Sequence, residues 1–89
     1  MIIWKFQLAV IDSQILSLPR GATILTVQMQ CDDLQLWALC DADSTVEDRI
    51  IRIIGTGHSI PPNESERLRY INTFQMGGGS LVFHVFERK

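Results

Sequence analysis

The chain is organised around one segment, Ile50-Ile51-Arg52-Ile53-Ile54-Gly55-Thr56-Gly57-His58-Ser59-Ile60-Pro61-Pro62. Four isoleucines around a single arginine predict a strand that is buried in a core. Gly55-Thr56-Gly57-His58 then ends the strand in a flexible polar loop, and the two prolines prevent further ladder pairing. We therefore expect a buried β-strand that delivers a histidine-bearing loop to the surface, where a ligand or another chain can approach the backbone.

Outside this segment, apolar residues mostly recur at every second position, which is the period of β-strands. Turn signals separate the runs at Asp12-Ser13, Pro19-Arg20-Gly21 and Gly77-Gly78-Gly79. The sequence predicts strands over Ile2–Leu8, Gln14–Leu18, Thr23–Gln30, Leu34–Cys40, Ile50–Ile54, Tyr70–Met76 and Ser80–Glu87, with the third and fourth forming a hairpin. Residues 1–89 should thus form one all-β domain, a compact antiparallel sandwich or partly open barrel of about seven strands.

Two segments interrupt this alternation. Asp41–Asp48 either caps a single helical turn or forms an acidic loop. His58–Arg67 forms either a solvated loop or a single helical turn that starts near Asn63.

The charge balance narrows the class of partner. Eight Lys and Arg residues against ten Asp and Glu give a formal net charge of −2, and no basic stripe is present. A reader of duplex nucleic acid normally carries such a stripe, so we expect no nucleic-acid duplex as partner. A pocket for one or two phosphates remains compatible with this composition, since it needs only two or three local donors.

The cysteines and the apolar runs indicate the compartment. We expect Cys31 and Cys40 to be reduced thiols, because Met1–Phe6 alternates and forms no signal-type apolar run. The alternative is a disulfide between them across a hairpin. Two cysteines and two distant histidines, His58 and His84, do not make a zinc motif, so no metal or cofactor is expected. No apolar run reaches membrane-spanning length, and the expected location is the cytosol.

Surplus apolar surface predicts self-association. The first strand, the isoleucine strand and the last strand carry apolar residues on both faces, whereas a small sandwich covers only one face of each. Edge pairing or face packing in a homo-oligomer would cover the rest. The alternative is that the surplus residues are half-exposed at strand ends.

The glycine loop resembles a phosphate-binding loop only in outline. A nucleotide-binding fingerprint needs a third glycine or a Lys-Ser/Thr pair followed by a helix, and Pro61-Pro62 replaces that helix here. The backbone amides can still form an anion-binding nest, and nearby arginines can add bidentate contacts. The expected ligand-binding residues are Arg52, Gly55, Thr56, Gly57, His58 and Arg69. The alternative is that these arginines are solvated and paired with neighbouring carboxylates, Asp48, Glu64 or Glu66.

No catalytic signature accompanies this loop. A general base such as His58 needs an orienting carboxylate and a nucleophile within reach, and no spacing in the chain indicates them. His84 is interpreted as a partly buried strand histidine satisfied by a neighbour. Trp37 is the better candidate of the two tryptophans for exposure. We therefore expect no enzyme and no catalytic residue.

A set of segments distributed over nearly the whole chain resembles a family of small β-domain proteins encoded by tailed phages and prophages. These segments are Ile3–Phe6, Leu18–Ala22, Leu25–Gln28, Leu36–Leu39, Ile53–His58, Tyr70–Gln75 and Leu81–Glu87. The resemblance implies a phage origin and a small β fold, and it carries over no catalytic residue. It places the protein in the cytosol of the host cell.

The leading functional hypothesis follows from that resemblance together with the residues. It is a non-enzymatic phage accessory protein that counters host defence as a homo-oligomer, sequestering a small phosphorylated, nucleotide-derived signal. The alternatives are a protein–protein inhibitor or adaptor that binds a host protein through a strand edge or the Trp37 face, and a minor virion component.

Overall fold

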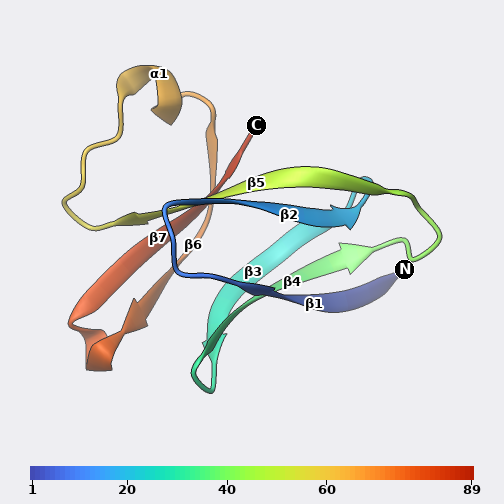
Figure 1. Cartoon of the computed structure of the whole chain (residues 1–89), viewed down its shortest axis with the longest axis horizontal. Coiled ribbons are helices and arrows are strands. Elements are labelled where there is room, and N and C mark those ends of the chain that lie inside the picture. Colours follow the sequence, from blue (N-terminus) through green and yellow to red (C-terminus); the bar gives the residue numbers. More distant parts are fainter.

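The computed structural model describes residues 1–89 and contains seven strands (Figure 1). They are β1 (Ile2–Leu8), β2 (Ser13–Pro19), β3 (Thr23–Gln30), β4 (Asp33–Cys40), β5 (Val46–Gly55), β6 (Leu68–Met76) and β7 (Leu81–Arg88). A four-residue helix, α1 (Pro62–Ser65), and a short turn, η1 (Gly77–Gly79), complete the chain. The expectation of an all-β domain with about seven strands is confirmed.

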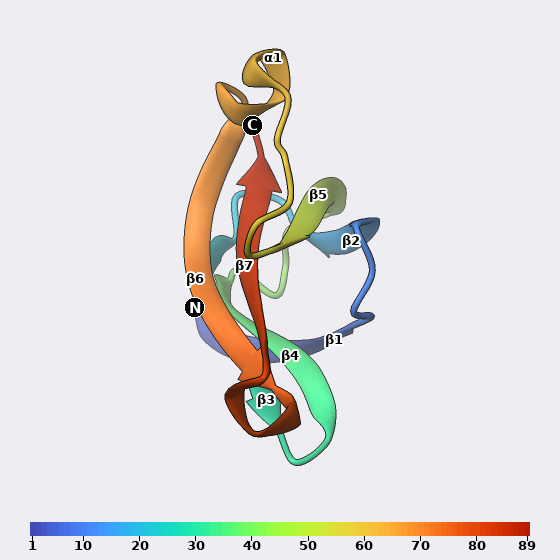
Figure 2. The same ribbon diagram turned by 90° about the vertical axis from the view of Figure 1, so that its left-hand side faces the viewer.

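The strands form two antiparallel sheets that do not close into a barrel. The smaller sheet has the order β1-β4-β3, and the larger sheet has the order β2-β5-β7-β6. The predicted hairpin of β3 and β4 is present, and Cys31 in its turn takes a positive φ of 55°. In Figure 2 the two layers are seen from the side, with α1 above the end of the larger sheet.

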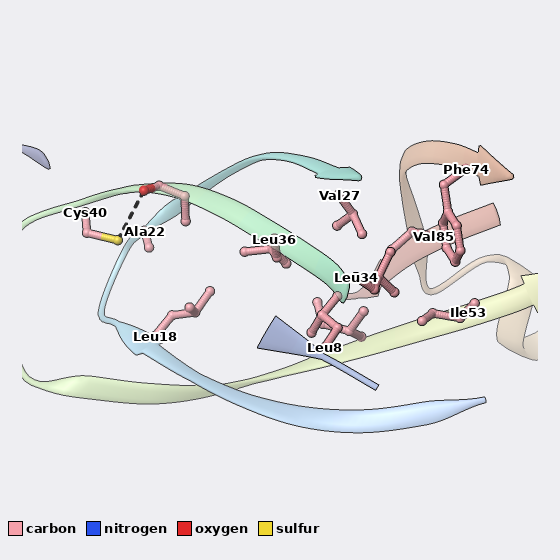
Figure 3. Packing of buried hydrophobic residues seen from close by; sticks show 12 residues of the cluster. Leu8, Leu18, Ala22, Val27, Leu34, Leu36, Cys40, Ile53, Phe74 and Val85 are labelled. Carbon is pink, nitrogen blue, oxygen red and sulfur yellow. Dashed lines mark hydrogen bonds between the residues drawn. The ribbon is translucent and has the colours of Figure 1, made fainter. Parts of the chain in front are cut away.

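The hydrophobic core lies between the inward faces of the two sheets (Figure 3). Alternate residues supply it, because successive side chains of a strand point to opposite faces. Its fully buried members include Leu18, Leu36, Ile51 and Val85, each with 0% exposure. The isoleucine strand is therefore buried as expected, and it occupies an interior position in its sheet.

One lateral side of the sandwich is held together by a side chain. The amide of Asn72 on β6 accepts a hydrogen bond from the Val27 amide of β3 (2.7 Å) and donates one to the Val27 carbonyl (2.5 Å). This bond pair imitates a ladder step between two strands that belong to different sheets. On the other side, β1 and β2 are the remaining sheet edges, joined by the loop of residues 9–12.

Several local expectations are now decided. Residues 41–45 form a loop and no helical turn, and β5 begins at Val46, so the predicted interruption over Asp41–Asp48 was too long. The start of β5 was not predicted, because Glu47 and Arg49 interrupt its apolar pattern. Both side chains face the inside of the sandwich, where they form hydrogen bonds with polar partners. The helical turn near Asn63 is confirmed as α1.

The expected exposure of the tryptophans was wrong. Trp37 is half-buried, because it lies on the central strand between Lys5 and Thr26 of its neighbours. Trp4 is 38% exposed, since β1 is an edge strand and covers it from one side only.

Both cysteines are free thiols. Cys31 is exposed in a turn, and Cys40 is buried at the far end of β4. The helices of the structure are too short and too polar to cross a membrane.

Candidate anion-binding site

Arg52 lies on the outward face of β5, where α1 folds over the larger sheet. Its Nε donates a hydrogen bond to Glu64 of α1 at 2.6 Å, and one terminal nitrogen donates to the Asp12 carbonyl at 2.6 Å. The diproline explains this arrangement, because a proline at the first helical position starts a helix with its φ already set. Arg52 thereby attaches the loop after β5 to the sheet.

A polar cleft of about 330 Å³ opens beside this contact, and we call it the arginine cleft. Its lining residues are Ser13, Arg52, Pro61, Asn63, Glu64, Arg67 and Arg88. The cleft holds three guanidinium groups and a single carboxylate, which Arg52 already engages. Arg67 and Arg88 are exposed and take part in no ion pair, so two positive charges face the cleft without a counterion.

The end of β7 is anchored directly beside this cleft. Leu68 of β6 pairs with Arg88 of β7, and the amide of Lys89 donates a hydrogen bond to the Arg67 carbonyl at 2.7 Å. The larger sheet therefore places Arg67 and Arg88 next to each other, although twenty residues separate them in the chain.

The glycine loop forms a second cleft, of about 460 Å³, which we call the Gly55 cleft. It is lined by Gly55, Thr56, His58, Ser80, Leu81, Val82 and Phe83. The His58 ring lies over Gly55, 3.4 Å from the position that a Cβ atom would take. Gly55 thus allows the close approach of the ring, and Gly57 supplies the positive φ of 89° that turns the loop back.

A chain of hydrogen bonds passes through His84 on the outward face of β7. Thr73 Oγ1 lies 2.9 Å from its Nδ1, Thr56 Oγ1 lies 2.7 Å from its Nε2, and the Tyr70 hydroxyl lies 2.6 Å from Thr73 Oγ1. The Thr56 hydroxyl donates to the Val82 carbonyl at 3.3 Å, so its oxygen is left to accept a hydrogen bond from Nε2–H of His84. The imidazole therefore fixes the start of the glycine loop to the sheet, as expected of a satisfied strand histidine.

Arg69 lies on the inward side of the larger sheet, away from the glycine loop. It lines a cleft of about 530 Å³ together with Arg49, Glu87 and Arg88, and a neighbouring cleft of about 330 Å³ with Ile71. Its cross-strand partner is Glu87, but both oxygens of that carboxylate accept hydrogen bonds from Arg49. Arg69 is left exposed and without an ion pair.

Arg49 and Glu87 form a bidentate pair at the end of the core. Their side chains are only 15% and 10% exposed, and Arg49 also donates to the Ala22 carbonyl at 2.8 Å. The hydrogen bonds that Arg49 donates to Glu87 raise the pKa of Arg49, against the opposing effect of burial. Glu47 adds a weaker attraction at 3.9 Å and accepts the Gly21 amide at 2.7 Å.

The residues expected to bind a ligand are thus distributed over two places. Gly55, Thr56 and His58 share the Gly55 cleft, and His58 and Arg52 meet in a small pocket of about 120 Å³. Gly57 is exposed in the loop, while Arg69 lies on the other side of the sheet and shares no cleft with the rest.

Arg67 and Arg88 line the arginine cleft but are absent from the expected ligand-binding residues, and no part of the sequence argument pointed to Arg88. Its only sequence signal is the terminal pair of cations, Arg88-Lys89, and the spacing of Arg67 and Arg69 around Leu68 is equally unspecific. No group of three or more His, Cys, Asp or Glu side chains is placed to hold a metal ion. The arrangement offers guanidinium, hydroxyl and amide donors, which are the groups that recognise oxyanions.

Comparison with known proteins gives one match. Neither the curated proteins nor the solved structures contain a match to the chain. The family model described as Domain of unknown function (DUF7352) matches residues 1–89, and the chain therefore belongs to this family.

Proposed function

We propose that this protein is a non-enzymatic binding protein that holds a small phosphorylated ligand in the arginine cleft. Sequestration of a nucleotide-derived signal, the anti-defence role implied by the resemblance to phage proteins, is the biological form of this proposal. The sequence predicted a site centred on the glycine loop. The proposed site is centred on Arg52, Arg67 and Arg88.

The excess of guanidinium groups over carboxylates in this cleft carries the proposal. Arg67 and Arg88 lie side by side without counterions in a chain whose formal net charge is −2. Like charges without partners repel each other, and a bound phosphate would turn this repulsion into charge-assisted hydrogen bonds. Arg52 is held at the cleft by Glu64, so its guanidinium is already oriented before a ligand arrives.

The surroundings of the two histidines support binding rather than catalysis. Both ring nitrogens of His84 contact hydroxyl groups, and no carboxylate orients the ring as in a nucleophile–base pair. His58 is exposed and lies over the Gly55 backbone, without a hydrogen bond from its ring to a nucleophile.

Titration calorimetry with inorganic phosphate and with ADP tests the proposal. Binding should weaken by roughly tenfold or more in Arg67→Ala and in Arg88→Ala, the effect of losing a charge-assisted hydrogen bond. Arg20→Ala is the matched control, because Arg20 is exposed and far from the cleft in the turn after β2. Unchanged affinity in both cleft variants, or absence of binding by the unchanged protein, would refute the proposal.

A second candidate function, association through a strand edge, rests on where apolar surface is exposed. Seven of the eleven exposed large hydrophobic side chains fall within residues 1–15, namely Met1 and six on β1, β2 and the loop between them. β1 is an edge strand whose only charge is Lys5, and such an edge is a template for pairing with another chain. The partner is a second copy of the chain or a host protein.

Light scattering separates these two partners. A homo-oligomer of the unchanged protein should dissociate in Ile3→Lys, which places a charge on the exposed edge. Gln7→Lys is the control, since it adds the same charge to β1 away from the apolar end. A monomer at all concentrations would exclude the second copy as partner.

A further inference from the structure

A second group of unpaired positive charge adjoins the arginine cleft. Arg88 lines the arginine cleft on one side and the 530 Å³ cleft of Arg69 on the other. Arg67 and Arg69 flank Leu68, which is the cross-strand neighbour of Arg88 at a Cα separation of about 5 Å. In Figure 2 the end of β7 lies beside the start of β6, below α1.

The carboxylates near these arginines are already engaged. Arg52 binds Glu64 in the arginine cleft, and Arg49 binds both oxygens of Glu87 behind Arg69. Three guanidinium groups, those of Arg67, Arg69 and Arg88, therefore remain exposed without an ion pair within one small region.

Two further carboxylates lie in the Arg69 cleft and limit where an anion can bind. Glu47 accepts the Gly21 amide at 2.7 Å, and Asp48 accepts the Ser17 hydroxyl at 3.1 Å. Both belong to β5, and β7 lies between that strand and Arg69 on β6. An anion is therefore favoured only in the half of the cleft formed by β6 and β7. This half meets the arginine cleft at Arg88, at the end of the sheet, where a ligand can pass from one face to the other.

We propose that Arg69 and Arg88 form a second anion subsite, so that the ligand carries two phosphoryl groups and spans Arg88. One phosphoryl group lies in the arginine cleft against Arg67, and the other lies against Arg69. Guanidinium groups suit this role because each presents several N–H donors and can contact two oxyanions at once. The ligand class is a diphosphate or a bisphosphorylated small molecule. This inference rests on the proposed function, since it assigns the second half of the same ligand.

Calorimetry at constant ionic strength with orthophosphate and pyrophosphate distinguishes one subsite from two. Pyrophosphate should bind at least about tenfold more tightly than orthophosphate, as an added charge-assisted hydrogen bond implies. Arg69→Ala should remove that advantage and leave orthophosphate affinity within about twofold, whereas Arg67→Ala should weaken both anions. Lys5→Ala serves as the control and should change neither affinity, because Lys5 lies on β1 of the smaller sheet and lines neither cleft.

The charge of pyrophosphate alone does not explain this pattern, because a general charge effect would respond equally to Arg67 and Arg69. The side chain of Arg69 is exposed and makes no hydrogen bond or ion pair, so its truncation should leave the melting temperature unchanged. Arg69→Gln, which keeps the length of the side chain, should repeat the result.

Three outcomes would overturn the inference. Equal affinities for the two anions, or an unchanged pyrophosphate affinity in Arg69→Ala, would remove the second subsite but leave the proposed function standing. Absence of binding for both anions would refute the proposed function together with the inference.

Discussion

The pair of Arg49 and Glu87 makes the clearest stability prediction. Glu87→Gln keeps the shape of the side chain but removes its charge, so Arg49 is left at 15% exposure with only the weaker attraction of Glu47 at 3.9 Å. Removing one partner of a buried ion pair costs about 3–5 kcal/mol, because the remaining charge stays desolvated. Arg49 keeps its hydrogen bond to the Ala22 carbonyl, which places the expected cost near the lower end of this range.

This loss is large for a small domain. A domain of 89 residues has an unfolding free energy of roughly 4–13 kcal/mol at typical values per residue. For such a chain 1 kcal/mol shifts the melting temperature by about 4–8 °C, so a loss of about 3 kcal/mol lowers it by at least about 12 °C. Urea unfolding followed by the fluorescence of Trp4 and Trp37 measures the change directly.

The double variant Arg49→Met/Glu87→Met tests the physical reason. It removes both charges and fills the space with apolar atoms, so it should cost only about 1 kcal/mol, mainly from the lost partner of the Ala22 carbonyl. The desolvation argument would be wrong if the double variant lost as much stability as the sum of the single changes. It would also be wrong if Glu87→Gln alone cost less than about 1 kcal/mol.

The same pair gives a sign for the dependence on pH. Glu87 raises the pKa of Arg49 in the folded protein, so the charged guanidinium stabilises the fold at every pH below its ordinary pKa. That contribution disappears only when the pH rises through the folded-state pKa, in the strongly alkaline range. The contribution of Arg49 to stability should therefore stay constant from neutral to mildly alkaline pH. The difference in unfolding free energy between wild type and Arg49→Met, measured at several pH values in this range, should not change.

Three further changes probe the core, the connection between the sheets and the glycine loop. Ile51→Ala empties a fully buried position and should cost about 2–5 kcal/mol in urea unfolding, whereas Ile51→Val should cost only about 0.5–1.5 kcal/mol. Asn72→Ala leaves the amide and carbonyl of Val27 without partners, so it should lower the unfolding free energy by about 1–3 kcal/mol. Hydrogen exchange at the Val27 amide should also become faster, and an unchanged exchange rate would contradict the bridging role. Thr56→Val removes the hydroxyl that links the loop to His84, so the ¹⁵N shift of His84 Nε2 should change while stability falls by only about 1 kcal/mol.

Much of the fold could be predicted because β-strand alternation is a local signal. Most of the strands were recognised from side chains that alternate within a few residues. The exception is instructive, since the first part of β5 carries Glu47 and Arg49 on its inward face. Charged residues at core-facing positions break the expected pattern, and only their distant partners make them compatible with burial.

The candidate site was much less predictable. The glycine loop was recognised, but Arg67 and Arg88 were not among the expected binding residues, and Arg69 was grouped with residues from which the sheet separates it. Arg52 lies on β5 and Arg69 on β6, which follow one another in the sequence, yet the two side chains point to opposite faces of the larger sheet. Their separation follows from the register and a bulge between Tyr70 and Asn72, neither of which is visible in the spacing of the residues.

The sequence by itself determined the strands, the turns between them and the burial of the isoleucine segment, because these depend on contacts and torsions within a few residues. The tertiary structure decided which arginines keep an unpaired charge. Arg49 pairs with Glu87, which lies 38 positions further along the chain, and Arg52 pairs with Glu64 only because α1 folds back over β5. Arg67, Arg69 and Arg88 are left without counterions for the same reason, since electrostatic pairing depends on distances in space that strand register sets.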